Sequence, residues 1–374
     1  MGRTRKNRVQ ARANRLAWPL SLALILASIG LGDAQAAENA TQFYILGLKT
    51  TMAGFTPPPG TYLIDINYFY AGSASGNAAV GIALRRLANP NLPPPRFTLQ
   101  ADINLDADAQ LTAPLLLWVA PGKVLGGNVG LGVIVPYGRK AVDVDIDALA
   151  TLTLPLLNRT IEAGRHFNFD QSTTDLGDPA LNALIGWHEG NWHWNLNALL
   201  NVPIGPWSNS SITNLPIHRW AFDATGAVTW LDPKMGLELS SAVGFTLNGE
   251  NPATDYTTGT EFHVEWAIVQ HFSKTFALGF DGYHYDQITG DSGPGATLGP
   301  FEGRVTGIGP VMTYSFSLAK IPVSTQWSYF HEFDVENRAQ GDVGMLTVTV
   351  PLSGAGLNLK VVRYGSLADI ARRV

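Results

Sequence analysis

The stretch Trp192-His193-Trp194-Asn195-Leu196-Asn197-Ala198-Leu199-Leu200-Asn201-Val202 decides the fold. Apolar side chains occupy its even positions from Trp192 to Val202, and the odd positions are mostly His and Asn. A period of two places successive side chains on opposite faces of an extended chain, whereas a helix needs a period near 3.6. The stretch therefore predicts a β-strand with one apolar face and one polar face.

The same alternation recurs in four further segments of the chain. Their apolar parities read Tyr62, Ile64, Ile66, Tyr68 and Tyr70 in the first segment; Phe97, Leu99, Ala101, Ile103 and Leu105 in the second; Leu237, Leu239, Val243, Phe245 and Leu247 in the third; Phe262, Val264, Trp266 and Ile268 in the fourth. Repeated matches to a period of two predict an all-β protein.

Soluble sandwiches also alternate, but three features favour a membrane strand. The strands are about 10 to 12 residues long, the length that a tilted strand needs to cross a bilayer. The polar parity is rich in Asn, Asp, Glu and His, which suits a wet lumen. Aromatic residues cluster near strand ends, where girdles at a membrane surface would lie; these are Tyr68, Tyr70, Trp192, Trp194, Trp230, Phe276, Tyr283 and Tyr285. We expect the apolar parity to face lipid and the polar parity to line a lumen.

The connections between strands alternate in length. Short turns rich in turn-forming residues fall at 188–191, 232–234, 273–275 and 319–320, and long links fall at 203–218, 249–259 and 288–302. Outer-membrane barrels have tight periplasmic turns and extended external loops. The candidate strands include two at 97–108 and 110–119 and none between 153 and 176. We predict a transmembrane antiparallel β-barrel of about 12 to 14 strands with a narrow or plugged passage.

Composition excludes several classes of protein. Of the 374 residues only 15% are charged, against about 25% in an average soluble protein, so disordered and nucleic-acid-binding chains do not fit. The chain contains no cysteine, which excludes disulfide scaffolds, thiolate metal sites and cysteine nucleophiles.

The N-terminus carries the pattern of an export signal. Six basic residues between Arg3 and Arg15 precede an apolar stretch from Leu16 to Leu31, and Ala34-Gln35-Ala36 supplies the small residues for cleavage. Cleavage removes six of the 25 basic and one of the 30 acidic residues and leaves a net charge of −10. We therefore divide the chain into a signal peptide (1–36), a periplasmic or plug segment (37–60), the barrel (61–352) and a C-terminal tail (353–374).

An ordered series of short motifs resembles one outer-membrane family. The series runs Trp187-His188-x-Gly190, Pro203-x-Gly205, Asn251-Pro252-x-Thr254-Asp255-Tyr256-x-x-Gly259, Gln287-x-Thr289-x-Asp291 and Gly307-x-Gly309-Pro310. Together these motifs are similar to the family named for the meta-pathway of phenol degradation, over roughly residues 60 to 352. The resemblance implies a β-barrel that passes aromatic or other hydrophobic compounds across the outer membrane, and it implies no catalytic residue.

Parity assigns a set of side chains to the path of a substrate through the lumen. They are Asp102, Asn104, Asp106, His193, Asn195, Asn197, Glu261, His263, Glu265, Tyr283 and Tyr285. A slip of one residue in register would invert each assignment. His188, beside Trp187 at a short turn, is expected to be a capping or girdle residue.

Two kinds of polar group have alternative interpretations. Asp102, Asn104, Asp106 and Asp108, and likewise Asp143, Asp145 and Asp147, have the spacing of calcium ligands. An EF-hand loop, however, would need Gly and Glu where alanine and leucine stand. Glu261, His263 and Glu265 share one strand face and could bind a divalent metal or act as acid and base. For both groups a polar lumen wall is the preferred interpretation, so we expect no metal and no cofactor.

Three functions remain open at this level. The favoured one is a channel in the cell outer membrane for passive uptake of small hydrophobic or aromatic compounds. The alternatives are an outer-membrane lipid-modifying enzyme and a structural or adhesive barrel; the chain contains no Gly-x-Ser-x-Gly motif for the enzyme. Expected partners are outer-membrane lipid, the substrate and the barrel assembly machinery, but no nucleic acid.

Overall fold

A computed structural model describes residues 38, 41–83, 96–296 and 299–354. The expected signal peptide and the last twenty residues of the expected tail lie outside the described residues. Among the described residues, no helix is both long enough and apolar enough to cross a membrane.

Fourteen strands form one antiparallel sheet. In chain order they are β1 (Gly60–Ala83), β2 (Arg96–Val124), β3 (Gly127–Ile134), β4 (Tyr137–Leu154), β5 (Arg159–Leu176), β6 (Ala180–Glu189), β7 (Trp192–Asn201), β8 (Ala221–Asp232), β9 (Leu237–Asn248), β12 (Glu261–His271), β13 (Phe276–Gln287), β14 (Arg304–Leu318), β15 (Ile321–Glu336) and β16 (Gln340–Gly354). The short strands β10 (Glu250–Asn251) and β11 (Tyr256–Thr257) pair separately, and a 3-10 turn, η2 (Pro155–Leu157), joins β4 to β5.

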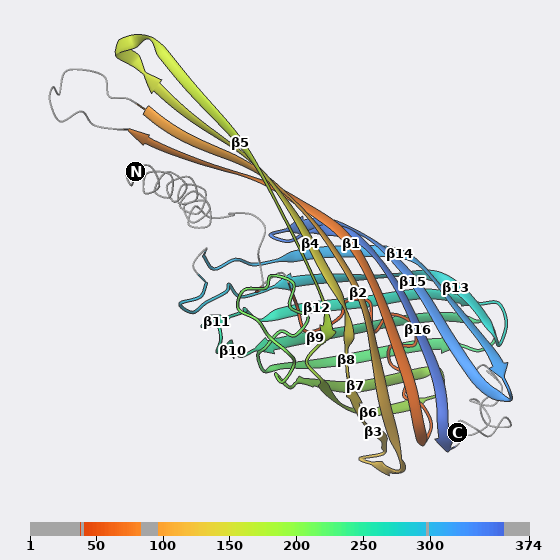
Figure 1. The fold of residues 1–374 in the computed structure, drawn as a ribbon. Helices are drawn as coiled ribbons and strands as arrows, with labels where there is room; N and C mark the ends of the chain where they lie inside the picture. The colour runs from red at the N-terminus through yellow and green to blue at the C-terminus, as the bar shows by residue number, and fades with distance from the viewer. Residues whose placement is uncertain (1–37, 39–40, 84–95, 297–298, 355–374) are drawn as a thin grey trace, which may run out of the picture. The chain divides into compact units, whose positions relative to one another are not determined.

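The sheet closes on itself through twelve of these strands. Strands β6 to β9 and β12 to β16 are hydrogen-bonded neighbours in chain order (Figure 1). Strand β16 pairs with β1, β1 pairs with β2, and β2 pairs with β3, which pairs with β6 and completes the ring. Strands β4 and β5 extend the sheet from β2 as two additional strands. The predicted antiparallel barrel is confirmed.

Two expected strand boundaries were wrong. Strand β2 runs unbroken from 96 to 124, where two strands were expected, because no turn-forming residue separates Asp108 from Leu111. Strand β5 lies where no strand was expected. Most of its side chains are exposed on both faces, so nothing imposes an apolar parity on its sequence.

The chain folds as two compact units. The smaller unit, over its described residues, comprises 75–83, 96–104 and 145–168, the distal parts of β1, β2, β4 and β5. Within it, Asn168 donates to Asp145 over 3.0 Å and His166 contacts Asp147 at 2.9 Å across β4 and β5. The larger unit contains the remaining described residues and every site discussed below.

Strand β7 shows the expected reversal of the burial pattern of a soluble protein. Leu196 is 57% exposed, whereas Asn195 and Asn197 on the other face are 4% and 7% exposed. The neighbouring strands β8, β9, β12 and β13 also expose apolar side chains, among them Phe222, Val243, Ile268 and Phe280. An apolar outer face around buried polar rows is stable in lipid and not in water, because burial of apolar surface against lipid replaces burial in a core.

Strands β1 and β2 reverse the parity that the sequence predicted. Tyr62 and Ile66 of β1 are 0% and 3% exposed and Leu117 of β2 is 2% exposed, so the apolar parity of these strands faces inward. Tyr68 and Tyr70 pack against the interior cluster that contains Ile66 and so do not belong to an outer girdle. The interior therefore has an apolar side as well as a polar side, which an assignment by polarity alone misses.

Candidate functional site

The interior of the barrel holds a segment of its own chain. We call residues 41–59, which lead into β1, the inner segment. The barrel end with the links 202–220, 249–260 and 288–303 is the loop rim, and the end with the short turns at 190–191, 233–236, 272–275 and 319–320 is the turn rim. At the loop rim, Glu38 is hydrogen-bonded to the 249–260 link, and near the turn rim Thr56 lies against Gly186 of β6. The inner segment thus runs lengthwise between the two rims.

Glu265 on β12 is the main anchor of the inner segment. Its Oε1 accepts the backbone N–H of Gly47 over 2.7 Å, and its Oε2 accepts the backbone N–H of Lys49 over 2.5 Å and the hydroxyl of Tyr44 over 3.2 Å. Glu265 is fully buried. A buried carboxylate with three donors is well satisfied, and here all three donors belong to the inner segment.

Four more wall residues hold the following turn of the inner segment. Glu238 on β9 accepts the backbone N–H of Met52 over 2.6 Å, and Asp281 on β13 accepts the Thr50 hydroxyl over 2.9 Å. Thr229 on β8 accepts the Gly54 N–H over 3.0 Å, and Asn195 on β7 donates to the Ala53 carbonyl over 2.8 Å. Contacts from five different strands fix the segment at the centre of the polar wall.

Gly54 is required because the inner segment approaches the wall backbone closely there. A Cβ atom on Gly54 would lie 2.3 Å from the carbonyl oxygen of His193 and 2.6 Å from the Thr229 nitrogen. Gly47 adopts a φ of +87°, a left-handed conformation that glycine reaches without steric cost. Glycine at these two positions lets a short, hydrogen-bonded chain fit inside the barrel.

The other side of the inner segment packs against apolar wall. Tyr44 and Leu46 belong to a buried cluster with wall residues of β1 and β13 to β16, namely Ile66, Tyr283, Tyr285, Val305, Phe330, Val343 and Met345. The Tyr44 ring also stacks on His263 with centroids 3.8 Å apart. The segment therefore separates a polar half of the interior from an apolar half.

One titratable group of the inner segment is strongly affected by this environment. Lys49 donates through Nζ to Asn195 over 3.2 Å. Burial lowers the pKa of Lys49 to about 8, although the nearby Glu265 and Asp223 carboxylates act in the opposite direction.

The substrate-path residues predicted from parity fall into two groups. Eight are buried in the interior: His193, Asn195, Asn197, Glu261, His263, Glu265, Tyr283 and Tyr285. Asn195, His263 and Glu265 contact the inner segment directly, and the Tyr285 hydroxyl donates to Glu261 over 2.9 Å. The other three, Asp102, Asn104 and Asp106, are exposed and lie on the face of β2 opposite its buried parity, so the structure does not bring them to this site.

Sequence reasoning missed several wall residues that the structure brings together. Asp223 accepts from Thr246 over 2.8 Å and contacts His263 Nε2 at 2.9 Å. Glu238 contacts His271 at 2.8 Å as well as the inner segment. The polar parity of β8 and β9 contained these residues, but the contact of Asp223 with His263 and that of Glu238 with the inner segment depend on closure of the barrel and were not readable from spacing. Tyr283 and Tyr285, expected also near an outer girdle, instead point inward to Glu332 and Glu261.

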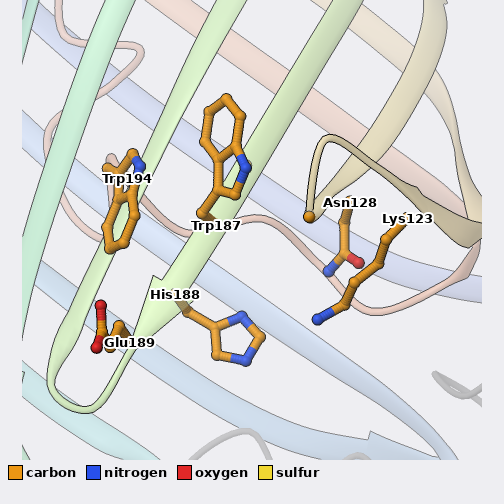
Figure 2. Close-up of a pocket in the computed structure, with 8 residues that line it drawn as sticks. Lys123, Asn128, Trp187, His188, Glu189 and Trp194 are labelled. Atoms are coloured by element: carbon orange, nitrogen blue, oxygen red, sulfur yellow. The ribbon is translucent and has the colours of Figure 1, made fainter.

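A pocket of about 250 Å³ lies at the turn rim. Figure 2 shows Lys123 near the end of β2 and Asn128 near the start of β3 beside His188 and Glu189 at the end of β6, with the rings of Trp187 and Trp194 above them. The two indole rings stack 6.4 Å apart, and Trp187 donates to the carbonyl of Leu125 over 3.0 Å. His188 thus lines a pocket at the rim rather than the buried interior. Within the described residues, no group of three or more acidic or histidine side chains could hold a metal ion.

A closed antiparallel barrel with an apolar outer face and buried polar rows defines an outer-membrane β-barrel protein, the class that Gram-negative bacteria place in their outer membrane. The family model described as "Putative MetA-pathway of phenol degradation" matches residues 72–348, so the chain belongs to this family. The resemblance drawn from the sequence motifs is confirmed.

One solved structure shares this fold. The chain is similar to the COG4313 outer membrane channel from Pseudomonas putida F1, with 14% identity, coverage of 82% of this chain and 99% of that chain, and a TM-score of 0.54. A Pseudomonas aeruginosa FadL homologue matches with 9% identity, coverage of 86% and 99%, and a TM-score of 0.39. A search of curated protein sequences gives no match.

Proposed function

We propose that this protein is an outer-membrane channel for passive uptake of small hydrophobic or aromatic compounds, with the inner segment as its plug. The observation that carries the proposal is the position of the inner segment, which is hydrogen-bonded to five strands on one side and packed against apolar wall on the other. The fold it shares with the Pseudomonas putida channel supports the proposal.

The two-sided interior suits a hydrophobic solute. When the inner segment moves aside, a small aromatic molecule can follow the apolar strip of Ile66, Phe330 and Met345. Contacts with this strip would take the place of the contacts that the molecule makes with water. The polar rows opposite would stay hydrated, so the solute would bind the strip on one side only and could dissociate from it. Selectivity would come from the width and chemistry of this passage. Passage needs no energy source, because the solute moves down its gradient.

The buried residues of the polar wall have two roles in this proposal. In the closed state Asn195, His263 and Glu265 hold the plug. In the open state these three would line the substrate path together with His193, Asn197 and Glu261, as parity predicted. Tyr283 and Tyr285 would flank the apolar strip. The exposed apolar faces would contact outer-membrane lipid, and insertion would depend on the barrel assembly machinery.

Uptake into vesicles tests the proposal. Refolded protein in liposomes that contain an indicator for toluene or phenol should raise the rate of uptake above that of empty liposomes, and the double variant Glu265→Gln/Asp281→Asn should raise it further because the plug loses two anchors. Glu302→Gln, at an exposed position, is the matched control. Equal uptake for empty liposomes, wild type and the double variant would refute a transport role.

A further inference from the structure

A carboxylate site lies at the loop rim, and a residue of this chain fills it. Glu38 accepts Asn251 Nδ2 on both oxygens, at 3.0 and 2.8 Å, and Oε1 also accepts the Thr254 hydroxyl over 2.6 Å. Arg219 Nη1 lies 3.9 Å from Glu38 Oε2. Asn251 is 0% and Arg219 1% exposed. These groups form a buried, preorganised receptor for one carboxylate.

The remaining contacts of Arg219 keep this receptor in place. Its Nε donates to Asn248 Oδ1 over 3.0 Å, and Nη2 donates to the carbonyl of Thr41 over 3.3 Å. Thr41 is the first described residue of the inner segment, so Arg219 contacts both Glu38 and the plug. Because a buried guanidinium needs a nearby anion, loss of Glu38 from the site is costly unless another anion takes its place.

A narrow crevice, with no room for a water molecule while Glu38 is in place, adjoins the carboxylate site. Glu38, Thr41 and Arg219 line it together with Trp207, Pro216 and Ile217 of the 202–220 link. The Trp207 ring stacks on His218 with centroids 5.1 Å apart. Departure of the Glu38 side chain would open this crevice. A ligand with a flat or compact apolar body would then occupy the vacated space against Trp207, Pro216 and Ile217, with its carboxylate where that of Glu38 lies.

We propose that Arg219, Asn251 and Thr254 bind small aromatic or alicyclic monocarboxylates from the loop side, and that such a ligand displaces Glu38 and releases the loop end of the plug. The exchange replaces one carboxylate by another, so the charge around Arg219 is unchanged. A neutral isostere cannot make this exchange. This inference rests on the proposed function, because it adds a substrate class and a trigger to the same passage.

Calorimetric titration of refolded protein in detergent micelles tests the inference with benzoate and cyclohexanecarboxylate as ligands and benzamide as the neutral control. In Glu38→Gln the internal competitor loses its charge, and benzoate should bind about tenfold more tightly than to wild type. Glu250→Gln, an exposed position in the same link, should bind like wild type. Adding Thr254→Val to Glu38→Gln should weaken benzoate binding several-fold without altering the folded barrel, as judged by heat-dependent gel mobility.

Benzamide binding as tight as benzoate binding, or no benzoate binding to a folded Glu38→Gln variant, would overturn the inference. Equal benzoate affinity in the Glu38→Gln and Glu250→Gln variants would also overturn it. The outcomes distinguish this inference from the proposed function. Toluene uptake without benzoate binding would refute only the carboxylate site, whereas benzoate binding without any uptake would support the site and refute the channel.

Discussion

Replacing Glu265 with Gln should free the plug without unfolding the barrel. The carboxylate accepts two backbone N–H groups and one hydroxyl from the inner segment, and an amide offers only one oxygen. One backbone N–H then faces an amide N–H in a buried site. Hydrogen bonds to a charged acceptor contribute roughly 1.5–3 kcal/mol each. We expect a loss of about 3 kcal/mol in docking, which corresponds to an increase of about 100-fold in the undocked population.

The absence of native cysteine allows a direct assay of docking. Ala53 is 5% exposed in the inner segment, so Ala53→Cys is a small change that a maleimide reaches only when the segment undocks. The rate of labelling should rise about 100-fold in Glu265→Gln and stay at the parental value in Glu302→Gln. An unchanged rate in Glu265→Gln, with the barrel folded, would refute the assignment of Glu265 as the anchor.

Three further predictions follow from particular contacts. Gly54→Ala should expose the Ala53→Cys reporter because the new Cβ would lie 2.3 Å from the His193 carbonyl oxygen. Gly164→Ala, whose Cβ would have no atom within 4 Å, should leave the labelling rate unchanged, and equal labelling of the two variants would count against the close approach of Gly54 to the wall. Leu196→Arg, on the outward face, should destabilise folding into vesicles by roughly 2–4 kcal/mol in a denaturant titration, and a cost below about 1 kcal/mol would contradict a lipid-facing position. The pKa of Lys49 is about 8 when the inner segment is docked and about 10.4 when it is free, so docking should strengthen roughly tenfold from pH 8 to 9.5. The labelling rate of Ala53→Cys, normalised to that of an exposed cysteine, should fall correspondingly over this pH range, and Lys49→Met should abolish the pH dependence.

Period-two alternation was sufficient to predict the barrel and the faces of β7, β9 and β12. Along β7 the even positions are exposed or half-buried and the odd positions are buried, as the apolar and polar side chains required. The prediction succeeded because the lipid outside the barrel favours apolar side chains at one set of alternate positions, and the polar interior favours polar side chains at the other set.

The same rule failed where the interior is apolar. Ile66 faces inward and packs with Tyr44 and Leu46 of the inner segment, and Tyr62 packs inside with Leu117 and Val119 of β2. No local pattern indicates which partner an apolar parity will meet. The anchors Glu238 and Asp281 were missed for a related reason. Their partners Met52 and Thr50 are far away in sequence, and only closure of the barrel brings them together.

The outward orientation of the apolar parity can be measured directly along β7. Nitroxide labels placed singly at residues 192–201 of the protein in vesicles would report their collision rates with oxygen, which concentrates in the acyl region, and with a water-soluble nickel complex. We predict high oxygen collision at the even positions, led by Leu196, and low collision at the odd positions, where Asn195 and Asn197 lie in the plugged interior. High oxygen collision at Asn195 and Asn197, or no alternation along the strand, would contradict a lipid-spanning barrel with a polar interior.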